Sequence, residues 1–218
     1  MVTPDLVSEE DIAKLIIPNG LPNDEPSFKA YIEAEVYDKE GRLIQHNRQP
    51  MRSLTQWFLA LITIPLLGTY QGPSINTAQP ILTNVLGMPS QQSSYPGSGV
   101  VVWDWSIQLG SGTQSFSLTL KSLAAPIANG SGAGQLLYGT ISVSYAGTSI
   151  FVSVTVTNYT SSTISVTEIG LVGNIYVVYA GPAYNTFTFL LSYDTFSTPI
   201  SIPPNGLATF QVMLSFTG

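Results

Sequence analysis

Apolar and polar residues alternate along much of the chain from residue 100 onward. In the segments 103–109, 152–157 and 210–216, a large apolar side chain occupies every second position, and mostly Asp, Ser, Thr or Gln lie between them. A period of two places the apolar side chains on one face of a strand, so one face is buried and the other is solvated. This pattern predicts antiparallel strands, and the same alternation predicts a further strand over 116–120.

Turn signals separate these segments at short intervals. Ala146-Gly147 predicts a tight hairpin between strands at 139–145 and 149–157, and Lys39-Glu40-Gly41 predicts another hairpin earlier in the chain. Short strands with regular turns are typical of a sandwich or jelly roll. We therefore expect a mainly β fold, an antiparallel β-sandwich of jelly-roll-like kind.

The segment 54–67 has a different pattern, because it carries no charged side chain and is apolar on nearly every side. Ser53 and Gln56 match the S-x-x-Q capping box, and Pro65 and Gly68 mark an end. The sequence predicts one buried apolar helix over 54–67. A bilayer span needs about 20 apolar residues, so no membrane span is expected. A subunit-contact helix and a membrane-active segment remain alternatives.

Residues 1–27 are acidic and interrupted by prolines, which disfavour a long helix. We expect an extended N-terminal arm that contacts a neighbouring subunit and precedes a single domain at 28–218. The domain also contains a long loop at 69–99, rich in Pro, Gly, Ser and Gln. The apolar residues assigned to the contact of the arm are Ile12, Leu15, Ile16 and Ile17.

Charged residues are unevenly distributed along the chain, and their scarcity excludes some classes of function. Charged residues make up 9% of the chain, against roughly a quarter in typical soluble proteins. After residue 52 the only charged side chains are Asp104, Lys121, Glu168 and Asp194. A surface so poor in cations does not hold a polyanion, so nucleic-acid binding by this region is not expected. The absence of cysteine excludes disulfides and thiol chemistry. We expect a protein that works outside the cell.

The residues show little catalytic chemistry. His46 is the only histidine, so a His-based catalytic triad would need it. The sequence has no G-x-S-x-G element to supply the serine nucleophile, so an exposed strand histidine is the simpler interpretation. Asp104, Glu168 and Asp194 could converge on a hard cation or form a glycosidase pair, or each could cap a turn or bind backbone N–H groups. We expect no catalytic residue, no cofactor and no metal site. Asn129 and Asn158 each begin a glycosylation sequon on a predicted loop.

Several short elements resemble β-sandwich structural proteins of prokaryotic virus particles. They are the L-G-x-G element with Gly110 and Gly112, GQLLYG at 134–139, TEIGL at 167–171, LLSYDTF at 190–196 and PISIPPNG at 199–206. The resemblance covers about residues 30–218 and is closest to turret, tail or fibre components, especially from viruses of thermophilic archaea. The chain departs from the pattern at Tyr193, where such proteins often carry a basic residue.

This resemblance implies scaffolding and no catalytic residues. We expect a capsid or appendage subunit, located in the extracellular virion, that assembles with copies of itself and with other virion proteins. A host-surface glycan or receptor is a further possible partner. One alternative is a pilus or adhesin subunit that assembles by strand addition. A glycan-active enzyme that uses Glu168 and Asp194 is another.

Overall fold

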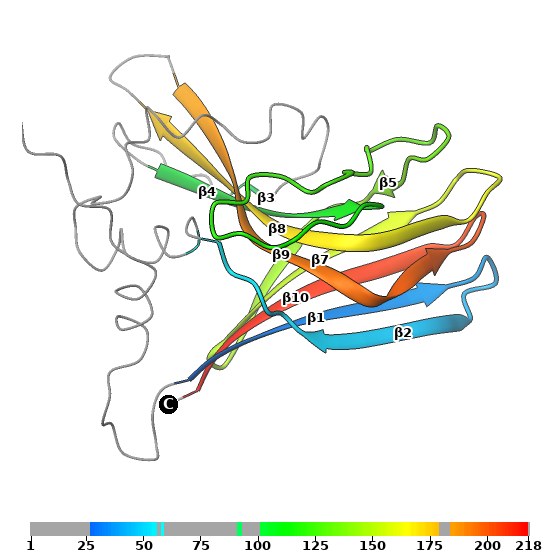
Figure 1. Cartoon of the computed structure of the whole chain (residues 1–218), viewed down its shortest axis with the longest axis horizontal. Coiled ribbons are helices and arrows are strands. Elements are labelled where there is room, and N and C mark those ends of the chain that lie inside the picture. The colour runs from blue at the N-terminus through cyan, green and yellow to red at the C-terminus, as the bar shows by residue number, and fades with distance from the viewer. Residues whose placement is uncertain (1–26, 56–57, 59–90, 93–100, 179–183, 218) are drawn as a thin grey trace, which may run out of the picture.

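The computed structural model describes residues 27–55, 58, 91–92, 101–178 and 184–217. The chain is mainly β, with two antiparallel sheets (Figure 1). The strands are β1 (Ser27–Tyr37), β2 (Leu43–Pro50), β3 (Gln91–Gln92), β4 (Val101–Gly110), β5 (Leu137–Tyr138), β6 (Ser142–Ala146), β7 (Ser149–Thr157), β8 (Ile164–Val178), β9 (Tyr184–Ile202) and β10 (Leu207–Thr217).

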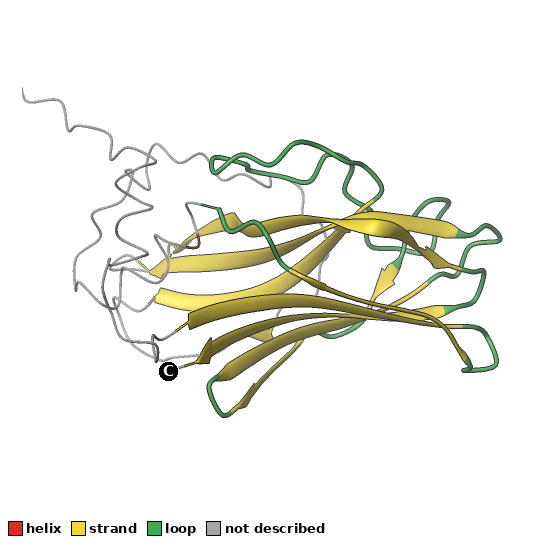
Figure 2. Cartoon of the chain, turned by 60° about the horizontal axis from the view of Figure 1, so that its bottom comes forward, coloured by secondary structure: helices red, strands yellow, loops and turns green. Residues whose placement is uncertain are grey.

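The first sheet has the order β2-β1-β10-β7-β5, and β6 pairs with the same side of β7 as β5. The second sheet has the order β3-β4-β8-β9. Figure 2 shows the two sheets as layers that face each other. The chain leaves the first sheet after β7, forms β8 and β9 in the second sheet, and returns as β10 beside β7.

The core lies between the sheets, as the alternation predicts. Ile32 and Phe210 of the first sheet, and Ile107, Leu171 and Ile202 of the second, are fully buried in one hydrophobic cluster. Their neighbours along each strand point outward, because successive side chains of a strand lie on opposite faces. The predicted strands around 103–109, 152–157 and 210–216 are therefore confirmed.

The outer face of the second sheet is covered by the segment 111–126. Leu120 and Leu123 of this segment pack against Val172, Leu190 and Tyr193 in a second, smaller cluster. The strand predicted over 116–120 is wrong, because residues 116–120 form irregular structure and a turn. Their alternating residues divide between contact with the sheet and solvent: Leu120 joins the cluster, whereas Phe116 is exposed.

The outer edge of β9 is covered by the chain that follows β2. Leu54 forms an antiparallel bridge with Ser192, and the Thr55 N–H donates to the Leu191 carbonyl at 2.9 Å. Two glutamine side chains of β2 also bond to the backbone along this edge of β9. Gln45 and Gln49 both donate to β9 carbonyls through Nε2 and accept β9 backbone N–H groups through Oε1. The two sheets are thus joined along this edge by hydrogen bonds.

The buried helix predicted over 54–67 is not supported. Leu54 and Thr55 are extended and pair with β9, because their backbone groups bond to the edge of the sheet instead of starting a helix. Phe58 alone has helical backbone among the residues described, with a turn-forming bond from its N–H to the Thr55 carbonyl. Residues 56–57 and 59–67 lie outside the described residues. In the part of the chain that the structure describes, no helix is long and apolar enough to cross a bilayer.

The other segment boundaries need smaller corrections. Ser27 begins β1, so it belongs to the first sheet and not to the arm. Residues 1–26 lie outside the described residues. Of the loop predicted at 69–99, only Gln91 and Gln92 are described, and they form β3 on the edge of β4.

Candidate assembly surface

The outward face of the first sheet carries a row of apolar side chains near the β1–β2 turn. Tyr37 of β1 pairs with Leu43 of β2 on one side and with Leu207 of β10 on the other. Leu207 pairs in turn with Thr157 of β7, which also pairs with Leu137 of β5. Leu43, Leu137 and Leu207 are exposed by 53%, 42% and 36%. We call these five residues the apolar row, although Thr157 in it carries a hydroxyl group.

Sequence alternation alone did not identify this row. The apolar residues of β2 and β5 are not part of a clear alternation along the chain, and four pairings among five strands align them. Ile44 follows Leu43 at a register shift between β1 and β2 and is also exposed. Side chains directly opposite on neighbouring strands lie about 5 Å apart, so the row forms a continuous strip that is apolar except at Thr157.

The two halves of this sheet differ in charge. Strands β5, β6, β7 and β10 contain no charged residue. Strands β1 and β2 carry Lys29, Glu33, Glu35, His46 and Arg48. Depletion of charge is typical of the central part of a protein interface, whereas charged groups are typical of its rim.

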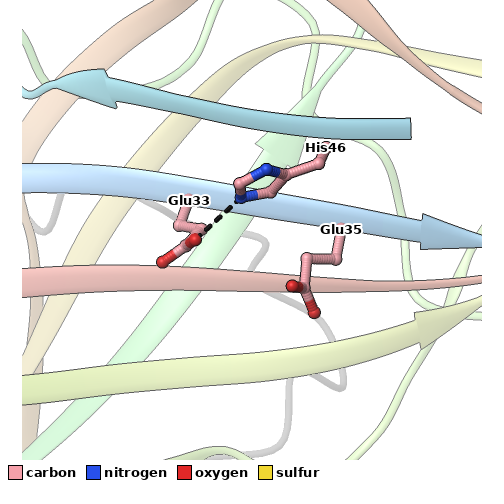
Figure 3. A group of neighbouring side chains, drawn as sticks. All are labelled: Glu33, Glu35 and His46. Atoms are coloured by element: carbon pink, nitrogen blue, oxygen red, sulfur yellow. Dashed lines mark hydrogen bonds and ion pairs between the residues drawn. The ribbon is translucent and has the colours of Figure 1, made fainter. Parts of the chain in front are cut away.

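A cluster of polar side chains lies on the charged half, next to the apolar row (Figure 3). Glu35 and His46 are directly opposite on β1 and β2, and Glu33 is two residues away on the same face. His46 Nε2 lies 2.8 Å from Glu33 Oε1, and one ligand atom from each of the three residues lies within 4.8 Å of the others. The Tyr37 hydroxyl donates to Glu35 at 2.7 Å.

One imidazole and two carboxylates are ligand types that zinc accepts. The cluster also satisfies itself by hydrogen bonds, as cross-strand pairs on an exposed sheet often do. The interpretation of His46 as an exposed strand residue agrees with its position. Sequence reasoning missed Glu33 and Glu35, although the E-x-E spacing and the turn at 39–41 place them opposite residues 46–48.

Glu168 is fully buried and holds the covering segment of the second sheet. Its carboxylate accepts the backbone N–H groups of Gly112, Ala124 and Ala125 at 3.2, 3.0 and 2.8 Å. Gly110 of β4 pairs with Glu168 of β8, and a Cβ at Gly110 would come within 2.6 Å of Glu168 Cγ. The L-G-x-G element therefore has a packing role, since both of its glycines make room around this carboxylate and the segment that it binds.

Asp194 also binds backbone groups. Its carboxylate accepts the N–H groups of Arg52 and Thr195 at 2.7 and 2.9 Å. It borders a cleft of about 300 Å³ that also includes Gln114, Phe116 and Tyr193. The Tyr193 hydroxyl donates to the Gln114 carbonyl and accepts its N–H, so the polar walls of the cleft are bonded to each other.

The structure thus favours the simpler interpretation of Glu168 and Asp194, in which each binds nearby N–H groups. Asp104 pairs through its backbone with Asn174 on β8. Because Glu168 is fully buried, it is not accessible to a polysaccharide as a general acid.

The two glycosylation sequons have different surroundings. The Asn158 side chain is fully buried, and its Nδ2 donates to the carbonyls of Ser162, Ile202 and Pro203. A glycan on Nδ2 is incompatible with this packing, which disfavours Asn158 as a possible glycosylation site. Asn129 is partly exposed, and its Oδ1 accepts the Tyr138 N–H. The predicted contact residues Ile12, Leu15, Ile16 and Ile17 lie outside the described residues.

Comparisons with protein-family models, with curated proteins and with solved structures find no match to this chain.

Proposed function

We propose that this chain is a structural subunit of a virus particle, a β-sandwich of jelly-roll-like kind that assembles with copies of itself and with other particle proteins. The observation that carries the proposal is the apolar row. Exposed apolar side chains that are contiguous across several strands are typical of interaction sites, whereas single exposed ones are common. The short elements that resemble virion proteins support the choice of a virus particle.

The neutral half of the first sheet supports assembly with identical copies. A contact between identical surfaces brings each side chain near its own symmetry mate or that of a neighbour, so charges of one sign repel. Strands β5, β6, β7 and β10 avoid this repulsion because they carry no charge. Such a contact depends little on pH or on salt, which suits a particle that persists outside the cell.

The carboxylates support a scaffolding role. Glu168 holds the segment 111–126 on the second sheet, and Asp194 holds the chain after β2 on β9. Both are used to fix irregular segments on the sheets in a chain that has no disulfides. A non-enzymatic role follows as part of the proposal.

A pilus or adhesin subunit that assembles by strand addition is the second candidate. The short uncharged strand β6 at the edge of the first sheet favours it, because an open strand edge can accept a strand from another chain. Electron microscopy of the native assembly separates the two candidates. Closed shells, turrets or tails would support the virion proposal, and long filaments attached to cells would support the alternative.

A solution experiment tests the apolar row directly. Sedimentation of the full chain over a range of concentrations should show association for the wild type and mainly monomer for Leu137→Gln/Leu207→Gln. The control is Phe116→Gln, since Phe116 is similarly exposed at 39% but lies in the segment over the second sheet. A wild type that remains monomeric at every concentration, or a double variant that associates as the wild type does, would contradict the proposal.

A further inference from the structure

Strand β6 differs from the edge strands β2 and β9. The edge strand β2 has a register shift at its start, an exposed Arg48 and a terminal Pro50, all of which hinder pairing with another chain. The edge of β9 is covered by Gln45, Gln49 and residues 53–55. Strand β6, with the sequence SVSYA, has no proline, charge or register shift.

The hairpin between β6 and β7 determines which backbone groups of β6 face outward. Ala146 pairs with Ser149 across a two-residue turn, and Gly147 at its first position has φ of 58°. This is the type II′ arrangement, in which the residues that flank the turn form a hydrogen-bonded pair. Because hydrogen-bonded and non-hydrogen-bonded pairs alternate, Ser142, Ser144 and Ala146 bond to β7. The N–H and C=O groups of Val143 and Tyr145 therefore point away from β7, outward from the edge of the sheet.

These outward groups are arranged symmetrically about Ser144. In an antiparallel pair of two β6 strands centred on Ser144, Val143 of each chain lies opposite Tyr145 of the other. This register pairs every outward N–H of one chain with an outward C=O of the other, so no backbone group of either residue is left unpaired. It also places an aromatic side chain beside a β-branched one, which is a favourable cross-strand combination.

We propose that β6 pairs with β6 of a second copy around a two-fold axis at Ser144, so that the first sheet continues across two chains. Tyr145 is 73% exposed, more than any other large apolar side chain whose burial the structure describes. The pairing would cover it with Val143 of the partner. The absence of charge from β6 and from its neighbour β7 means that the two-fold axis brings no like charges together.

This inference rests on the proposed function and specifies one contact of the assembly. A strand of five residues is short, so the pair is expected to be weak alone and to strengthen where other contacts hold the two chains together. The other occupant to be tested is a segment of a neighbouring chain such as residues 12–17, which include Ile12, Leu15, Ile16 and Ile17.

Because the chain contains no cysteine, a single introduced thiol reports the register. In the proposed pair, the two Ser144 residues face each other at a non-hydrogen-bonded position, with Cα atoms about 4.5 Å apart. That separation is within the range for a disulfide. The matched control is Ser142→Cys, since Ser142 is on the same strand and is also exposed. In the proposed register its symmetry mate lies four residues further along, about 13 Å away.

Both variants would be oxidised mildly at a concentration at which the wild-type chain associates. We expect at least about tenfold more covalent dimer from Ser144→Cys than from Ser142→Cys, because the register holds only the first pair of thiols together. In the Ser144→Cys background, Val143→Pro should abolish the dimer. Its proline removes an N–H that β7 does not use, so circular dichroism should still show a folded chain.

Equal cross-linking of the two cysteine variants would overturn the proposed pairing. If Val143→Pro prevents association although Ser144→Cys forms no disulfide, β6 binds a different segment and the self-pairing is wrong. If the wild type associates but Val143→Pro has no effect, the proposed function stands and this contact is excluded. Absence of association in every variant would instead count against the proposed function.

Discussion

Glu168 provides a strong test of how this chain holds its irregular segments. The side chain is fully buried, yet it accepts three backbone N–H groups from the segment over the second sheet. Two of these groups, from Gly112 and Ala125, bind Oε1, and the N–H of Ala124 binds Oε2. Glu168→Gln keeps the shape of the side chain but replaces one acceptor oxygen with an NH₂ donor. A backbone N–H group that bound that oxygen then faces the NH₂ group, and neither can accept a hydrogen bond from the other.

The expected cost follows from these bonds. A partly buried N–H group without an acceptor costs about 1–3 kcal/mol, and the two bonds that remain lose the contribution of the negative charge. Against this, a neutral amide is easier to bury than a carboxylate. We expect a net loss of about 2 kcal/mol in the free energy of unfolding for Glu168→Gln. For Glu168→Ala, in which all three N–H groups lose their acceptor, we expect about 4 kcal/mol.

Urea unfolding of the full chain measures this loss as a lower midpoint with an unchanged slope. The control is Glu40→Gln, because Glu40 is an exposed acid in the β1–β2 turn and its replacement should change stability by no more than about 0.5 kcal/mol. Hydrogen exchange of the Ala124 and Ala125 amides should accelerate in the Glu168 variants. If Glu168→Gln is as stable as Glu40→Gln and both amides stay protected, the account of this carboxylate is wrong.

Three further predictions concern other sites in the fold. Gly110→Ala should lower the free energy of unfolding by about 1–3 kcal/mol in urea, since its Cβ would come within 2.6 Å of Glu168 Cγ. Asn158→Ala should be destabilised by about 2–4 kcal/mol in the same assay, because three buried or partly buried carbonyls lose their donor. The backbone N–H of Arg42, followed by its side chain, lowers the pKa of Asp38 from its ordinary value of 3.8. An NMR titration should show that lower pKa, and the contribution of Asp38 to stability should be present above pH 3.8 and be lost as pH falls through the lower value.

The strands could be predicted where tertiary packing and local pattern agree. β4, β7 and β10 each present one apolar face to the core, so the period of two survives in the sequence. The segment 116–120 has the same pattern without being a strand. Gln114, two residues before this segment, bonds to the Tyr193 hydroxyl through its backbone N–H and C=O groups. Pattern alone cannot distinguish a strand from an irregular segment that rests on a sheet.

The prediction of a helix starting at residue 54 was wrong for a related reason. Ser53 and Gln56 are a local signal for a capping box, but a sheet edge beside them offers the same backbone groups better partners. The Ser53 carbonyl accepts the Tyr193 N–H, and the Thr55 hydroxyl donates to the Leu190 carbonyl. Residues 53–55 therefore complete the edge of β9, and this edge could not be known before the sheet order.

The candidate surface was less predictable than the fold, because its residues are distant in the sequence. Leu43, Leu137 and Leu207 come from three strands and become neighbours only through the pairing of β1, β10 and β7. Composition did indicate that the later part of the chain lacks charge. It could not indicate that the missing charge leaves one half of one sheet neutral.

The uneven charge of the first sheet also limits the ways in which copies can associate through it. Arg48, Pro50 and the register shift make the β2 edge unsuitable for strand pairing, whereas the neutral β6 edge has none of these features. Among the described strands of the first sheet, β6 is thus the edge suited to pairing, and the proposed two-fold pair would use that edge in both chains. A larger particle therefore requires a second kind of contact. We propose that the apolar row is this contact, because it lies on the face of the sheet and would remain exposed when the edges are joined.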